Sequence, residues 1–217
     1  MLFNDADAAW WIEMEQRIID TLVDLAPLGF VLAPVPHERG WTDDATMRLR
    51  PGVADALVSA RDALPAGYNF KILDAHRSWE LQQRYAQRSL ARIRAAYPDW
   101  SEQQVTAHLW RMAPPARVVP RLNSHRYGGA VDVAVLDAAG NELDMGVPAG
   151  YVAGPEADLL HYELKASLTD AEQRYRDNRR VLIEAMHAAA FHPYLAEWWH
   201  WSYLRDIEAN AAPSSSS

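Results

Sequence analysis

Residues 123–136 read NSHRYGGAVDVAVL, and this stretch decides how the chain folds. The run AVDVAVL at 130–136 is rich in β-branched residues, which favour strands, and AAGN at 138–141 follows it as a turn signal. These patterns predict a strand over residues 130–136. A histidine and two consecutive glycines come just before it, so a polar, bendable segment leads directly into an apolar strand.

His125 and Asp132 lie on either side of the start of this strand and are the first candidate metal ligands. Zinc in a hydrolase needs three protein ligands and an open position for water. Seven residues apart on a regular strand, the two side chains would point to opposite faces of the sheet. We therefore expect Gly128 and Gly129 to bend the chain so that both side chains reach one ion.

A second segment, EWWHWSY at 197–203, offers the third ligand. His200 would bind the ion, while Glu197, three residues earlier, would stay off it and hold its water. A straight strand would separate these two side chains as well. We therefore expect Glu197 to lie in the turn just before the strand.

The rest of the chain predicts helices and further strands around these segments. Apolar spacing and capping signals predict helices over residues 7–25, 52–64, 78–96, 101–112 and about 169–190, and strands over 30–32, 69–73 and roughly 197–203. Residues 29–51, with three prolines, are otherwise expected to be loop. Capping boxes are expected where Ser101 faces Gln104 and where Thr169 faces Glu172.

This order of elements favours the α+β class. We expect a single domain over residues 1–210, with a central, mostly antiparallel sheet flanked by helices. Pro213 and the four serines after it predict a disordered tail over residues 211–217.

Composition excludes several classes of function. The formal net charge is −8 and there is no basic block, so nucleic acid is not an expected partner. No apolar run approaches the roughly 20 residues that span a bilayer, and the N-terminus lacks the pattern of a signal peptide, so we expect a cytoplasmic protein without a membrane partner. Without cysteine, a transition-metal site must use His, Asp and Glu.

The predicted strand over residues 69–73 carries polar side chains at its C-terminal end, where side chains enter a cleft. These are Asp74, His76 and Arg77. On spacing alone, Arg77 and Asp74 favour a plain ion pair at a strand end.

Each motif also has an ordinary structural interpretation. A histidine near an aspartate is common, and an isolated E-x-x-H is no more specific. Trp198, Trp199 and Trp201 are typical of a core or a pocket wall, because tryptophan buries a large apolar area. The remaining histidines are interpreted as surface or hydrogen-bonded core residues: His37, His76, His108, His161, His187 and His192.

Taken together, the motifs resemble the zinc D-alanyl-D-alanine peptidase family. SHRYGGAVD, followed about 65 residues later by EWWH, is similar to that family's S-x-H-x-x-G-x-A-x-D and E-x-W-H patterns, and DAHR at 74–77 is similar to its D-x-x-R segment. Met145-Gly146, residues 178–191 and Trp198 resemble the dipeptidase branch, of the vancomycin-resistance and peptidoglycan-recycling type. The resemblance covers roughly residues 68–203 and implies that family's Hedgehog-like fold.

The resemblance also implies roles for individual residues. His125, Asp132 and His200 would hold one Zn²⁺ per chain, Glu197 would be the general base, and Arg77 would stabilise charge in the transition state. Iron, cobalt or nickel also fit such a donor set. The implied substrate-binding residues are Asp74, Asn123 and Ser124, and the implied activity is hydrolysis of a D-alanyl-D-alanine-like dipeptide.

Two departures from the family pattern suggest a changed substrate. Asn123 stands where the family has serine, although Ser124 is adjacent. The dipeptidases follow their Met-Gly with a segment ending in Phe-Asp that helps receive the substrate amine, whereas residues 145–150 here read MGVPAG. Replacement partners for an amine would be Asp144, Glu156 or Asp158.

Three functions therefore stay open. The first is a dipeptidase-like zinc hydrolase. The second is a carboxypeptidase or amidase of the same family that acts on a blocked, larger or non-D-Ala substrate. The third is a zinc-binding module without activity, against which Glu197 and Arg77 argue because binding alone needs neither. The sequence is compatible with a monomer and with a homo-oligomer.

Overall fold

The computed structural model describes residues 16–112, 124–151 and 153–205. A five-stranded sheet forms its centre, in the order β2-β4-β5-β7-β6, and β1 pairs with β3 in a separate two-stranded ladder. Within the sheet, β2 runs parallel to β4, and the other pairs are antiparallel. The predicted mostly antiparallel sheet with flanking helices is confirmed. The strands are β1 Val23–Asp24, β2 Val31–Leu32, β3 Arg48–Leu49, β4 Asn69–Asp74, β5 Ala130–Leu136, β6 His192–Pro193 and β7 His200–Ser202.

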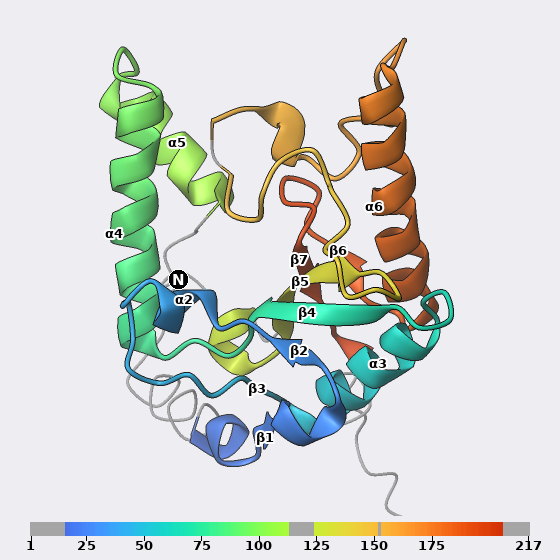
Figure 1. The fold of residues 1–217 in the computed structure, drawn as a ribbon. Helices are drawn as coiled ribbons and strands as arrows, with labels where there is room; N and C mark the ends of the chain where they lie inside the picture. Colours follow the sequence, from blue (N-terminus) through green and yellow to red (C-terminus); the bar gives the residue numbers. More distant parts are fainter. Residues whose placement is uncertain (1–15, 113–123, 152, 206–217) are drawn as a thin grey trace, which may run out of the picture.

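Helices stand on either side of the sheet (Figure 1). α4 lies on one side and α6 on the other, and the segment between β5 and α6 passes over the sheet between them. The α-helices are α2 Val35–Glu38, α3 Pro51–Asp62, α4 Trp79–Ala96, α5 Glu102–Met112 and α6 Asp170–Ala188, and the 3-10 helices are η1 Ala26–Leu28, η2 His125–Tyr127 and η3 Pro155–Ala157.

The core lies on both faces of β5, because all seven residues of this strand are buried. A strand that is covered on both faces reads as a continuous apolar run, and AVDVAVL does so except at Asp132. The largest fully buried side chains include Trp198, Trp201, Phe70 and Phe191. The tryptophans of the EWWHWSY segment are therefore core residues, as the sequence predicted.

Capping residues set where three helices begin. Ser78 accepts a hydrogen bond from the backbone N–H of Leu81 at the start of α4. Thr169 and Glu172 form the predicted capping box of α6. Ser101 and Gln104 form the other predicted box, because each side chain accepts from the other residue's backbone N–H, over 3.3 and 2.9 Å.

Some predicted bounds are wrong. Of the helix predicted over 7–25, residues 7–15 lie outside the described residues and residues 16–20 are helical. Val23–Asp24 instead forms β1 and pairs with β3, because pairing between distant segments overrides the local apolar spacing. The predicted loop over 29–51 holds α2 and β3. The strand predicted over 197–203 is shorter, since residues 198–199 form a turn and β7 begins at His200. The predicted tail, 211–217, lies outside the described residues.

Among the described residues, none of the helices combines the length and the apolar character that crossing a bilayer would require.

Candidate metal centre

Three adjacent strands place polar side chains side by side at one end of the sheet. In the ladder, Asp74 of β4 pairs with Asp132 of β5, and Asp132 pairs with His200 of β7. Residues directly opposite each other in a sheet point to the same face. A register shift between Ile72 and Asp74 brings Asp74 into this row. Strand pairing alone therefore aligns these three side chains.

His125 reaches the same place from η2, ahead of β5. Gly128 ends η2 with a φ of 60°, in the left-handed region that favours glycine. A Cβ at Gly128 would lie 2.5 Å from Cδ2 of Leu22 and 3.1 Å from the backbone nitrogen of Arg50. Gly129 then accepts a hydrogen bond from the backbone N–H of Tyr203 over 2.9 Å, at the beginning of the sheet. The chain bends before the strand, as expected, and Gly128 makes the bend.

His125, Asp132 and His200 each turn one donor atom toward the same point. Oδ1 of Asp132 lies 3.2 Å from Nε2 of His125 and 3.0 Å from Nδ1 of His200, and the two nitrogens are 3.1 Å apart. A tetrahedral zinc ion with bonds of about 2.0–2.1 Å holds its ligand atoms about 3.3 Å apart. The three donors thus have nearly the spacing of one face of a zinc coordination tetrahedron, and they fit the group that the sequence implied.

The protonation of two of the donors, His125 and Asp132, suits a divalent cation. Nδ1 of His125 lies 2.6 Å from the carbonyl oxygen of Ala75, so an N–H at this position donates there and leaves the lone pair of Nε2 facing the other donors. Burial and the nearby Arg77 lower the pKa of His125, which favours the neutral imidazole. Burial acts to raise the pKa of Asp132, but His125 and His200 outweigh it and hold that pKa well below its usual range. The site therefore offers an ionised carboxylate.

Arg77 links Asp74 to the second carboxylate oxygen of Asp132. Its Nε donates to Oδ2 of Asp74 over 2.8 Å and its Nη2 donates to Oδ2 of Asp132 over 3.2 Å. Its backbone N–H donates to the carbonyl of His125 over 3.1 Å. Burial opposes the charge of Arg77, but the neighbouring acidic groups outweigh it and raise its pKa. Arg77 is therefore more than the plain ion pair that spacing alone favoured.

Glu197 lies in the turn immediately before β7, as predicted. Its backbone N–H donates to the carbonyl of Tyr194 over 3.0 Å, and its own carbonyl accepts from the N–H of His200 over 3.2 Å. Burial acts to lower the pKa of His200, but the hydrogen bond and charge of Asp132, with a further contribution from Glu197, raise it. The charge of the Glu197 carboxylate thus acts on His200, while this carboxylate is not one of the three grouped donors.

Other candidate residues stand apart from the donor group. Ser124 is half-buried, and its carbonyl accepts from the N–H groups of Tyr127 and Gly129, while Asn123 lies outside the described residues. Asp144 caps the N–H of Gly146 over 2.9 Å on an exposed loop. The last two candidates for an amine partner lie in and just after η3: Glu156 and Asp158.

Sequence reasoning missed three residues that position the site. Tyr85 of α4 donates its hydroxyl to Oδ2 of Asp74, and the guanidinium of Arg77 lies 3.8 Å from its ring centroid. Arg50 is buried, and its Nη1 donates to the carbonyl of Tyr127 over 2.8 Å, which holds η2. No spacing in the sequence indicated Tyr85, because Arg77 precedes α4 and the contact depends on how this helix packs against β4.

Arg179 of α6, the third residue, anchors the segment that passes over the sheet. It is buried, and its guanidinium donates to backbone carbonyls along this segment: to Met145 over 2.6 Å, to Glu156 over 2.6 Å and to Asp158 over 2.7 Å. Tyr162 lies beneath the guanidinium, at 4.6 Å. Burial lowers the pKa of Arg179 to about 10, which leaves it charged at neutral pH.

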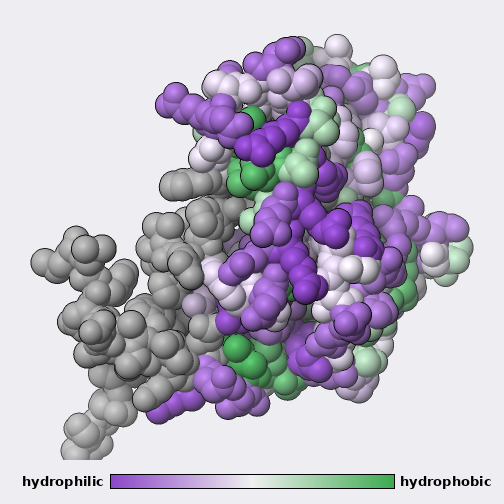
Figure 2. All heavy atoms as spheres, turned by 90° about the vertical axis from the view of Figure 1, so that its left-hand side faces the viewer, coloured by the Kyte–Doolittle hydropathy of each residue, from purple (hydrophilic) through white to green (hydrophobic). Residues whose placement is uncertain are grey.

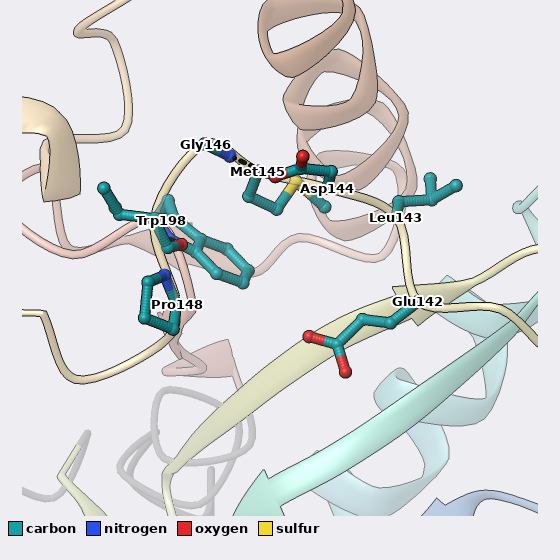
Figure 3. Close-up of a pocket in the computed structure, with 8 residues that line it drawn as sticks. Glu142, Leu143, Asp144, Met145, Gly146, Pro148 and Trp198 are labelled. Atoms are coloured by element: carbon teal, nitrogen blue, oxygen red, sulfur yellow. Dashed lines mark hydrogen bonds between the residues drawn. The ribbon is translucent and has the colours of Figure 1, made fainter.

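A shallow pocket of about 300 Å³ lies along residues 142–148, against Trp198 (Figure 3). Nε1 of Trp198 donates to the carbonyl of Val147 over 3.1 Å, which joins this segment to the turn that holds Glu197. None of the three metal donors lines this pocket. It is therefore a neighbour of the metal centre and not the centre itself.

Comparison with known proteins places these observations in a family. Residues 52–212 match the family described as D-ala-D-ala dipeptidase. A protein of Escherichia coli (strain K12) named D-alanyl-D-alanine dipeptidase is 34% identical over 110 residues, which are 48% of this chain and 51% of that protein, so the match spans about half of the relative's length. A protein of the same name from Synechocystis is 28% identical over 173 residues, which are 71% of this chain and 68% of that protein.

Proposed function

The chain belongs to the D-ala-D-ala dipeptidase family, and from that premise we propose that it is a zinc-dependent hydrolase that cleaves a peptide bond in a dipeptide-sized substrate. One observation carries the proposal: two imidazole nitrogens and one carboxylate oxygen lie within 4.8 Å of one another, and an arginine holds the second carboxylate oxygen. A site that only bound a metal would not need that arginine. One Zn²⁺ per chain, held by His125, Asp132 and His200, would supply Lewis acidity.

Glu197 is the proposed general base. A base must lie within hydrogen-bond reach of the proton that it takes, directly or through one water. The turn before β7 keeps the Glu197 carboxylate next to His200 without using it as a ligand. In this proposal Glu197 takes a proton from the attacking water and returns it to the leaving amine.

Arg77 is the proposed donor to the charge that develops on the scissile carbonyl oxygen. Its Nη1 makes only a long contact to Gln82 Oε1, at 3.4 Å, while its Nε and Nη2 are fixed by Asp74 and Asp132. A donor that is fixed in advance costs no reorganisation during the reaction. Asp74 then acts as a positioning residue that sets the plane of the guanidinium.

The substrate follows less directly from the site. The relatives are named D-alanyl-D-alanine dipeptidases, which makes this dipeptide the first candidate. The alternative is a carboxypeptidase or amidase that acts on a blocked, larger or non-D-Ala substrate, because residues 145–150 carry no acid to receive a free amine. Of the replacement candidates, Asp144 already caps Gly146, while Oε2 of Glu156 is buried and has no hydrogen-bond partner among the described residues.

A hydrolysis screen on the zinc-loaded protein tests the proposal. D-Ala-D-Ala, its N-acetylated form and L-configured dipeptides would be offered in parallel, with Glu197→Ala as the inactive control and Glu184→Ala, an exposed glutamate of α6, as the matched active control. We expect turnover that both chelation and Glu197→Ala abolish. Zinc-loaded protein that cleaves none of these substrates would contradict the proposed activity, and preference for free D-Ala-D-Ala would contradict the changed substrate.

Cytoplasmic location and the identity of the native metal stay predictions. Metal analysis of protein purified without added zinc tests the second of these. Iron, cobalt or nickel in place of zinc would change the metal but not the proposed donor set.

A further inference from the structure

A cluster of arginines surrounds one tryptophan outside the metal centre. Trp41 is 7% exposed, and the guanidinium carbons of Arg39 and Arg88 lie 5.2 and 5.0 Å from its ring centroid. Arg84 donates to the backbone carbonyl of Trp41. An indole in contact with two guanidinium groups stabilises positive charge at this place, because its ring face attracts cations.

α4 supplies most of the cluster from one face. Arg84, Arg88 and Arg92 follow one another at intervals of four residues, so their side chains line the same side of the helix. Arg92 reaches across from α4 and donates to the carbonyl of Gly150, in the segment that passes over the sheet. The cluster therefore spans the gap between the helix and that segment. Figure 2 faces this side of the molecule, and hydrophilic residues cover much of its middle.

Among the described residues, no acidic side chain forms an ion pair with the arginines of the cluster, although Arg84 helps to lower the pKa of Glu80, one turn earlier on α4. Arg39, Arg84, Arg88 and Arg92 contact only the indole and backbone carbonyls there. Elsewhere on the same surface arginines are paired, as Arg94 is with Glu102 at 2.8 Å. Partial burial and the charge of Arg39 lower the pKa of Arg92, so the cations repel one another. This excess positive charge stands out in a chain whose net charge is −8.

Tyr85 links the cluster to the metal centre, because it contacts both Trp41 and Asp74. The ring of Tyr85 lies edge-on to Trp41, with 4.9 Å between the centroids, and the same tyrosine donates to Asp74 beneath Arg77. From Tyr85 to Arg92, α4 rises seven residues, or roughly 10 Å. One extended residue spans at most about 3.6 Å, so this distance corresponds to roughly three residues of peptide.

We propose that Arg39 and Arg88, which contact the ring of Trp41, and Arg92, whose charge acts on Arg39, form a binding site for an oxyanion, either a carboxylate or a phosphate. Guanidinium groups recognise both through paired N–H donors. The placement predicts that the anion belongs to a substrate that extends past the scissile bond along α4. That second statement rests on the proposed hydrolase function, whereas the anion site itself does not.

Calorimetric titration tests the site with three probes. Inorganic pyrophosphate reports a free anion, N-succinyl-D-Ala-D-Ala carries a carboxylate on the substrate, and N-acetyl-D-Ala-D-Ala is its counterpart without that added charge. The titrations use the Glu197→Ala background, so that no peptide is consumed. The test variant is Arg88→Gln/Arg92→Gln, and the matched control is Arg94→Gln, an arginine of the same helix that pairs with Glu102.

We expect the succinyl peptide to bind at least tenfold more tightly than the acetyl peptide. The double variant should abolish this difference and Arg94→Gln should preserve it. Saturable pyrophosphate binding that the double variant removes, with equal binding of the two peptides, would support a separate anionic ligand. Equal peptide affinities without saturable pyrophosphate binding, or anion binding that the double variant leaves intact, would overturn the site. A failed hydrolysis screen with successful anion binding would count against the hydrolase proposal alone.

Discussion

The floor of the metal centre and the wall beside it are built in different ways. The floor consists of Asp74, Asp132 and His200 on β4, β5 and β7, and backbone pairing between the strands sets its geometry. The wall consists of α4 and residues 143–158, and a few long side chains hold its two parts. Arg92 and Arg179 bind carbonyls of the segment, and Trp198 binds another.

This difference separates the chemistry of the protein from its selectivity. Many backbone hydrogen bonds must break together before the floor changes, whereas one side chain can reposition part of the wall. Substitutions in the wall can therefore change which substrate binds while the donor group stays intact. The four predictions below test this division.

The largest effect is expected at the floor, for Arg77→Lys. Lysine has a single point of charge and cannot hold Asp74 and Asp132 while it also faces the substrate. We expect kcat to fall by about 10²- to 10³-fold at saturating zinc. Steady-state kinetics measures this, with Arg94→Lys on the outer side of α4 as the control. A decrease of less than threefold would remove Arg77 from the proposed chemistry.

The next effect concerns how firmly the wall is attached. Arg179→Met leaves buried carbonyls of Met145, Glu156 and Asp158 without their donor, so we expect the free energy of unfolding to fall by about 3 kcal/mol. Denaturant titration measures it. Arg180→Met is the control, because Arg180 is exposed and pairs with Glu163, and should cost less than about 1 kcal/mol.

The zinc content of the Arg179→Met variant tests whether the floor depends on the wall. If the wall and the floor are separate, Arg179→Met should still bind one zinc per chain at temperatures where it is folded. Loss of metal in folded Arg179→Met protein would show that the floor depends on the wall.

A third effect concerns the bend before β5. Gly128→Ala places a Cβ 3.1 Å from a backbone nitrogen in a residue with a φ of 60°, so we expect it to lower the free energy of unfolding by about 2 kcal/mol. Gly140→Ala is the matched control, because Gly140 also has a positive φ but has open space around it, and it should cost about 1 kcal/mol. Equal losses in the two variants would mean that close packing at the bend adds nothing.

The smallest effect is expected where the wall meets the floor. Tyr85→Phe keeps the ring that Arg77 and Trp41 contact but removes the hydroxyl that donates to Asp74. We expect kcat to fall about tenfold with KM unchanged, because a hydrogen bond to a charged group contributes about 1.5 kcal/mol. Tyr97→Phe, at the far end of α4, serves as the control. A change in KM alone would assign Tyr85 to substrate binding.

The sequence predicted those parts of the site that depend on local chain geometry. The bend at Gly128 and the turn at Glu197 followed from the alternation of side chains along a strand, which is a local property. β5 was predicted with its observed bounds because its valine-rich run is apolar except at Asp132 and a turn signal follows it. The capping boxes were predicted because their partners lie within one helical turn.

The parts that it missed depend on contacts between distant segments. Arg50 binds the carbonyl of Tyr127, 77 residues away, and Tyr85 is seen to contact Asp74 only once α4 is placed beside β4. β1 and β3 contain two residues each, too few to show any periodicity. The roles of the site residues and the domain bounds stay predictions.

The position of β7 in the sheet has a consequence for biosynthesis. Of the described strands, β7 is the last along the chain, yet it inserts between β5 and β6 and brings the third donor. A nascent chain on the ribosome therefore exposes an unpaired edge of β5 until residues 200–202 emerge, and such edges promote aggregation. Up to that moment the chain holds two of its three donors, so metal capture is expected to be a late event in folding, after the sheet is complete.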